Sequence, residues 1–313
     1  MLILRSIKPT ITPFYLDAGD ILRLTLTDGR VWTMTLLEST AGILERANLE
    51  YNDRRVPRGN VSVYVFEALV KINGRVRSLR REIGSSQSFY APWIIDGVKI
   101  WFDASAAAFR ERNGFMAEKD WRHGLICCPP RLTRWAVQED GLPICPEPLR
   151  DWYSHPKRPL EIRDCYMGED CWMGPYNGAA AHCGLDVNMK IGTPLHAPFS
   201  LDTQRIYQSV SCGDDNNRWI GERLWPDGSL WQIQTHHITE TTVPPSEPVR
   251  AGKVYARAAG VAYGEVPHTH FLWRVIEQGG SYLLDPWILF SQTKIFDLRR
   301  CLTPEKFTRI QEN

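Results

Sequence analysis

Five of the eight histidines in this 313-residue chain lie in three short clusters in its second half. The first cluster, AAHCGLD, places His182 four residues before Asp186, and the last, EVPHTHF, places His268 two residues before His270. In an extended strand, residues two or four positions apart point to the same face. An imidazole and a carboxylate could therefore converge in the first cluster, and two imidazoles in the last.

Imidazole nitrogen and carboxylate oxygen are common ligands of zinc, and a catalytic site typically uses three protein ligands and leaves a fourth position open. The middle cluster, WQIQTHHITET, adds His236 and His237. Histidine is the side chain best suited to move protons near neutral pH. Each cluster alone is a weak signal, because most such pairs are incidental or structural. Their combination favours a zinc site with catalytic histidines.

The elements that must position these residues are expected to be strands. In the first ~130 residues, alternating apolar and polar stretches surround dipeptides that favour hairpin turns. There are three of these turns: Asp28-Gly29, Asn73-Gly74 and Asp96-Gly97. One short helix is expected from Ala104. The pattern predicts an N-terminal β-sandwich or barrel-like module with no chemistry of its own.

Prolines crowd the stretch 129–163, and such a run breaks both helix and sheet. Beyond it the chain returns to strand patterns, and long helices are missing. We therefore predict a mainly β protein of two domains. An accessory domain spans 1–128, a linker spans 129–163, and an antiparallel β domain that contains all three histidine clusters spans 164–313.

The composition excludes several partners. The formal net charge is +1, so the chain offers no electrostatic signal for nucleic acid. No stretch approaches the ~20 consecutive apolar residues of a transmembrane segment. The N-terminus, MLILRSIKPT, has too short an apolar run for a signal peptide. The eight cysteines include no CxxC pair, so a zinc ribbon is not expected; disulfides and buried thiols both stay open.

The segment from Tyr176 to Phe290 resembles the LytM/lysostaphin-type zinc metallopeptidases of peptidase family M23, which cut peptide cross-links in bacterial cell walls. HCGLD matches the HxGxD motif of that family, IGTPLHAP matches the strand and turn that follow, and HTHF matches the terminal HxHF. HITETTVPPSEPVRAGK resembles the stretch around the family's other catalytic histidine. The resemblance implies a LytM-like antiparallel sheet.

The resemblance also implies a Zn2+ site with three protein ligands: His182, Asp186 and His270. His268, the first histidine of the HxH motif, would act as general base on the metal-bound water. Cys183 is expected to point away from this site, and His196 is expected to be an ordinary surface or core histidine.

The second catalytic histidine is assigned to His237 rather than His236. The family's catalytic histidine precedes Leu, and Ile238 follows His237. His237 would stabilise the oxyanion or donate a proton, and His236 would point to the other face of its strand. Which of the two is catalytic stays open on the sequence alone.

The function implied by the resemblance is that of a zinc-dependent endopeptidase that hydrolyses stem or cross-bridge peptides of peptidoglycan. This substrate lies outside the cytoplasm, so we expect an extracytoplasmic location. We also hypothesise intramolecular inhibition by the N-terminal domain. The first alternative is a non-hydrolytic LytM-like factor that binds the wall or activates amidases, and the second is a zinc hydrolase of another amide. The third is a protein whose main functional unit is the N-terminal domain, acting as a wall- or glycan-binding module. The bond that is cut, the oligomeric state and the disulfide pairing are not readable from the sequence.

Overall fold

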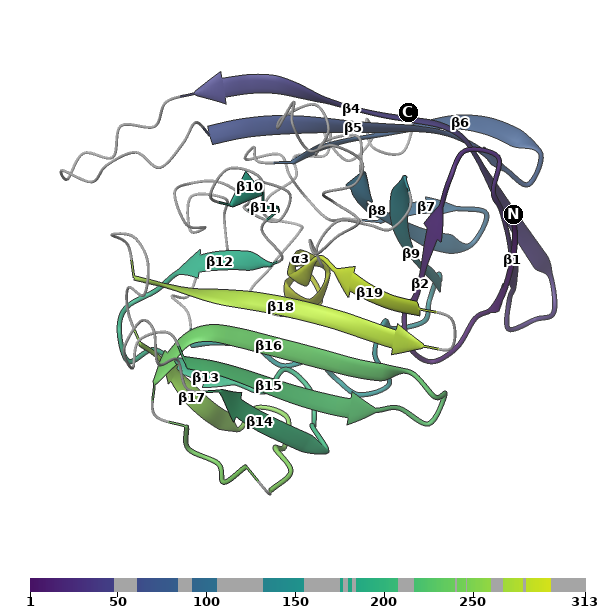
Figure 1. Ribbon diagram of the computed structural model, residues 1–313. Coiled ribbons are helices and arrows are strands. Elements are labelled where there is room, and N and C mark those ends of the chain that lie inside the picture. Colours follow the sequence, from purple (N-terminus) through teal and green to yellow (C-terminus); the bar gives the residue numbers. More distant parts are fainter. Residues whose placement is uncertain are drawn as a thin grey trace.

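The computed structural model describes residues 1–47, 61–83, 92–105, 132–154, 175–176, 180–181, 184–207, 217–239, 241–245, 247–259, 267–277 and 280–293 (Figure 1). Within some of these strands, including at Asp186, only the backbone is described. The described residues form strands β1 to β19 and one helix, α3 (Pro286–Phe290). The expectation of a mainly β chain is confirmed.

The N-terminal part forms two sheets. The first has the order β1-β3-β4-β5-β6, with bounds β1 (Leu2–Ser6), β3 (Ile21–Thr25), β4 (Val31–Ala47), β5 (Val61–Ile72) and β6 (Arg75–Ile83). The second has the order β2-β9-β8-β7, with bounds β2 (Thr12–Leu16), β9 (Thr133–Glu139), β8 (Val98–Ser105) and β7 (Trp93–Ile95). Residues of both sheets share one apolar core, in which Phe66, Phe102 and Trp135 are buried and the rings of Phe102 and Trp135 stack 4.2 Å apart. This is the sandwich-like arrangement that the sequence predicts.

The hairpin turns follow the sequence closely. Asn73 and Asp96 have φ of 45° and 50°, and a glycine with positive φ follows each. Two positive φ values in succession define the turn that matches the twist of paired strands. At Asp28-Gly29 the loop is longer, because β3 ends at Thr25 and the Leu26 N–H donates to the Arg30 carbonyl.

Two expectations about this half need correction. The stretch 129–163 was expected to break all regular structure, but β9 lies within it, buried between β2 and β8. Its residues TRWAVQE carry no proline, so they pair normally despite the prolines on both sides. The helix expected from Ala104 is wrong at its first residues, because β8 continues to Ser105; the remainder lies outside the described residues.

The C-terminal part forms one large sheet whose paired strands are all antiparallel, with the central order β12-β18-β16-β15-β14. β13 pairs with β17, β17 also pairs with β16, and β19 pairs with β18. The bounds are β12 (Leu185–Asn188), β13 (Pro194–His196), β14 (Thr203–Tyr207), β15 (Asn217–Leu224), β16 (Leu230–Thr239), β17 (Val254–Ala258), β18 (His268–Glu277) and β19 (Gly280–Leu284). Two further short strands, β10 (Pro175–Tyr176) and β11 (Ala180–Ala181), pair with each other.

Aromatic side chains fill the core beneath one face of this sheet. Trp219, Trp231, Trp273 and Phe271 are fully buried there. On β16 and β18 the buried aromatic residues lie an odd number of positions from His236, His268 and His270, so strand alternation sends these three histidines to the opposite face. The tryptophans therefore support the site by packing under it. No helix among the described residues is long and apolar enough to cross a membrane.

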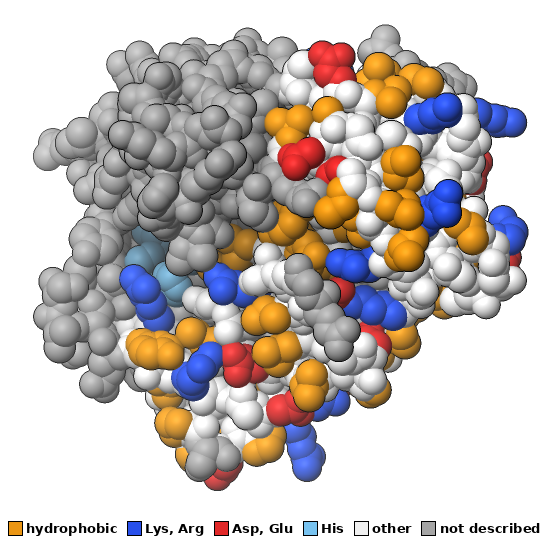
Figure 2. Space-filling view, turned by 45° about the vertical axis from the view of Figure 1, so that its right-hand side comes forward, with side chains coloured by type: hydrophobic (Ala, Val, Ile, Leu, Met, Phe, Trp, Pro, Cys, Tyr) orange, Lys and Arg blue, Asp and Glu red, His pale blue; other side chains and the backbone are white. Residues whose placement is uncertain are grey.

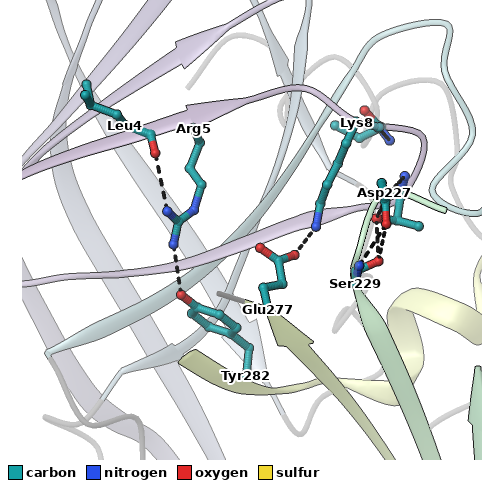
Figure 3. Close-up of polar contacts among 9 residues, drawn as sticks. Leu4, Arg5, Lys8, Asp227, Ser229, Glu277 and Tyr282 are labelled. Atoms are coloured by element: carbon teal, nitrogen blue, oxygen red, sulfur yellow. Dashed lines mark hydrogen bonds and ion pairs between the residues drawn. The ribbon is translucent and has the colours of Figure 1, made fainter. Parts of the chain in front are cut away.

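The N-terminal strand region is joined to the large sheet by a row of polar contacts (Figure 3). Lys8 forms an ion pair with Glu277 at the end of β18. The Thr10 hydroxyl donates to the Asp227 carboxylate at 2.6 Å in the loop that precedes β16, and Arg5 donates to the Tyr282 hydroxyl at 3.2 Å. The first two contacts lie at the ends of β18 and β16 that are farthest from the histidines, and the third is made to β19.

The contact between Thr10 and Asp227 is expected to make stability depend on pH. Burial raises the pKa of Asp227, but hydrogen bonds from Ser229 and Thr10 outweigh burial and hold that pKa below its ordinary value. A lowered pKa stabilises the fold above the unfolded value of about 3.9 and loses this effect as pH falls through the folded value. Thr10→Val should cost about 1 kcal/mol at pH 7 and less below pH ~4.

Urea unfolding of the parent and Thr10→Val between pH 7 and pH 3 checks this. Thr33→Val is the control, because that hydroxyl faces the amide of Asn73, which does not titrate. The expectation would be contradicted if Thr10→Val lowered the free energy of unfolding by the same amount over the whole pH range.

Candidate metal centre and catalytic histidines

Four histidines come together where β18 begins and β16 approaches its end. His268 and His270 are the first and third residues of β18, and both are buried, with 3% and 6% of their surface exposed. His236 lies directly opposite His270 in the antiparallel register of β16 and β18. His237 follows on the same strand, and both β16 histidines are half-buried.

A β-bulge at His237 breaks the alternation of β16. Asn217 pairs with Ile238 and Arg218 pairs with His236, so His237 is an extra residue with no partner position on β15. Its φ of 60° lies in the left-handed region, which is uncommon outside glycine. Such bulges re-aim side chains, and they are frequent next to active sites.

The bulge brings the rings of both histidines to the HxH pair. The ring centroids of His237 and His268 are 4.7 Å apart, and those of His236 and His270 are also 4.7 Å apart. The expectation that His236 points to the other face of the strand is therefore wrong. Strand alternation, on which that expectation rested, does not hold across a bulge.

Gly184 provides the space that the His270 ring occupies. A Cβ at this position would lie 2.6 Å from Nε2 and 2.7 Å from Cε1 of His270, and it would also overlap the Phe271 carbonyl oxygen. The glycine of HCGLD is thus required where β12 crosses the second histidine of HTHF. This role of Gly184 is not among the expectations from the sequence, although its place inside the HxGxD motif is a usable signal.

Gly184→Ala is expected to displace the His270 imidazole and to weaken metal retention. Overpacking typically costs 1–3 kcal/mol, and loss of support for a ligand lowers metal affinity by about 10–100-fold. Competition with a chromophoric zinc chelator measures the second effect. The matched control is Gly280→Ala, whose Cβ would have the flexible end of the Tyr282 side chain as its nearest neighbour, at 3.0 Å. Equal zinc retention in the two variants would contradict this account of Gly184.

The predicted ligands are only partly within the described residues. Asp186 on β12 is the backbone partner of His270, on the side away from His236. The side chain of Asp186, and His182 and Cys183 altogether, lie outside the described part. Among side chains that the structure describes, no group of three His, Cys, Asp or Glu could hold a metal. The His270 imidazole is nevertheless confined against Gly184, and Asp186 occupies the adjacent position on β12. An imidazole and a carboxylate are donors that suit zinc.

His196 lies apart from this cluster. One ring nitrogen is 2.7 Å from the Ser154 hydroxyl, and the other is 3.1 Å from the Gly252 carbonyl oxygen. These are ordinary hydrogen bonds from the end of β13 to two other segments, so His196 serves below as a control histidine.

Comparison with known proteins gave matches among solved structures only. No protein-family profile and no curated sequence matches the chain. The catalytic domain of the antimicrobial peptidase lysostaphin from Staphylococcus simulans is 25% identical, with a TM-score of 0.31, over 38% of this chain and 88% of that domain. Whole lysostaphin is 22% identical, with a TM-score of 0.31, over 44% of this chain and about half (49%) of its own length.

A zinc-containing peptidase from Vibrio cholerae is 11% identical, with a TM-score of 0.33, over 81% of this chain and 84% of its own. Peptidases of the type that the motifs predicted are thus among the similar structures. Because TM-scores near 0.3 carry no weight for function, the proposal below relies on the motifs and the geometry of the histidines.

Proposed function

We propose that this protein is a zinc-dependent endopeptidase that hydrolyses peptides of bacterial peptidoglycan, and that it works outside the cytoplasm. The observation that carries the proposal is the contact of two histidines of β16 with both histidines of the HxH motif, next to the strand of the HxGxD motif. When bound, a zinc ion supplies the Lewis acidity that amide hydrolysis needs near neutral pH.

In this proposal the zinc is held by His182, Asp186 and His270. His270 is suited to the role because it is almost fully buried and its ring is confined by Gly184. A ligand confined in this way does not have to be ordered when the metal binds. The backbone pairing of Asp186 with His270 brings the second ligand to the adjacent strand.

His268 and His237 move protons in this proposal. An imidazole nitrogen of His268 takes the proton from the attacking water, as the general base. His237, whose ring centroid lies 4.7 Å from that of His268, donates a hydrogen bond or a proton to the group that gains charge. The bulge at His237 fixes this approach, because it turns the ring toward β18.

His236 has a different role in this proposal. Its ring lies against His270 rather than His268, so it supports the metal side of the site. Residues next to a ligand orient it and tune its affinity for the metal. This division of the two adjacent histidines agrees with the assignment of His237 as the catalytic one.

Measurement of the zinc content tests the proposed metal site directly. Full-length protein dialysed against metal-free buffer should retain about one zinc per chain by elemental analysis. His270→Ala should lose it, and His196→Ala, a histidine variant outside the cluster, should retain it. A parent protein without zinc, or His270→Ala protein with full zinc, would reject the proposal.

A further inference from the structure

The histidines lie at one end of an open face of the large sheet. Strand alternation and the register of the paired strands place two residues of β16 on the same face as three residues of its neighbours. These are His236 and Gln232 of β16, Arg218 and Glu222 of β15, and Arg205 of β14. The opposite face carries the buried tryptophans. On the side of His236 that is away from β18, this face is formed by β15 and β14.

The residue next to the histidines on this face is a cation. Arg218 is exposed and lies directly opposite His236, and Tyr207, with 49% of its surface exposed, lies opposite Arg218 on the other side. Arg218 forms no ion pair with any residue that the structure describes. Figure 2 shows Lys and Arg side chains beside the exposed histidine surface.

Two further charges on this face neutralise each other. The Arg205 guanidinium pairs with the Glu222 carboxylate at 2.7 Å, and the Gln232 amide donates to the same carboxylate at 2.8 Å. Glu222 is therefore occupied. Arg218 lies directly opposite His236, whereas the cations of two other strands lie elsewhere on the sheet, Arg274 opposite Gln232 and Arg257 opposite Thr239.

We propose that the substrate is a peptide with a free carboxylate close to the scissile amide, and that Arg218 binds this carboxylate. The proposal rests on the proposed function. Arginine presents a planar fork that matches a carboxylate with two hydrogen bonds. Arg218 lies two strands from His270, about 10 Å at a strand spacing of about 4.8 Å, and an extended peptide advances about 3.4 Å per residue, so the carboxylate lies about two to three residues from the bond that is cut. An acidic stem peptide meets this requirement, and a bridge made of glycine does not.

Two synthetic peptides test the proposal, one with a free carboxylate two residues from the scissile amide and one with that carboxylate amidated. The zinc-loaded parent should cleave the acidic peptide with a kcat/KM about tenfold higher or more, mainly through KM. Arg218→Gln should remove this preference, and Arg218→Glu should reverse it. The matched control is Arg223→Gln on the same strand, because Arg223 alternates to the other side and pairs with Asp202 at 2.5 Å.

Equal kcat/KM for both peptides with the parent, or an unchanged preference in Arg218→Gln, overturns the proposal. If the parent cleaves neither peptide, the proposed function fails, and equilibrium binding of both peptides by calorimetry decides the role of Arg218 separately. Tighter binding of the acidic peptide by the parent alone supports an acidic-peptide site. Equal affinities in the parent and Arg218→Gln reject it.

Discussion

His268→Ala is expected to lower the rate of peptidoglycan hydrolysis by about 10²–10⁴-fold, the usual contribution of general acid–base catalysis. The side chain is 3% exposed and contacts His237, so its loss removes the proposed proton acceptor without removing a proposed zinc ligand. Zinc content should therefore stay near one per chain. The measurement is release of labelled fragments from purified peptidoglycan, with zinc determined on the same samples.

Neighbouring histidines provide the controls for this prediction. His237→Ala should reduce the rate to a similar extent, and the double variant should be no worse than either single one, because the two residues act as a unit. His236→Ala should instead weaken zinc retention, since its ring lies against His270. Loss of activity in His236→Ala with full zinc, beside an active His237→Ala, would show that the two roles are exchanged.

Residues 164–313 expressed alone are expected not to fold cooperatively. Trp152 is 1% exposed, packs against Phe271 at 4.9 Å between ring centroids and donates to the Tyr255 hydroxyl at 3.1 Å. On the other side, Leu272 and Leu283 of the large sheet are buried in the core of the N-terminal sheets. Removal of residues 1–163 deletes Trp152, and it also exposes Leu272 and Leu283 to water.

Denaturant unfolding followed by circular dichroism measures this dependence. In the full chain, Trp152→Ala alone should lower the free energy of unfolding by about 3–5 kcal/mol. Trp93→Ala, at a half-buried edge position, should cost clearly less. A cooperative unfolding transition in the isolated 164–313 fragment would contradict the expectation and restore the picture of independent domains.

The features that the sequence predicts well are those that depend only on residues close together in the chain. Asn73-Gly74 and Asp96-Gly97 form the expected turns because only residues that tolerate positive φ fit there. The shared face of His268 and His270 also follows from alternation alone, and each contacts a histidine of β16.

The features that it misses depend on pairing between distant segments. The bulge at His237 exists because the register between β15 and β16 shifts by one residue at Asn217. The alternation of apolar and polar residues within β16 alone does not predict this shift. β9 forms because β2 and β8 flank it, although its surroundings are rich in proline. The bond between Thr10 and Asp227 joins positions 217 residues apart, and neither residue has a local signal for the other.

The most direct test of the central claim is mass spectrometry of purified peptidoglycan after incubation with full-length, zinc-loaded protein, beside His268→Ala. We predict new free peptide ends with the parent only, and their masses would identify the bond that is cut. Absence of new ends with the parent, at one zinc per chain, would contradict the assignment as an endopeptidase and favour a factor that binds the wall without cutting it.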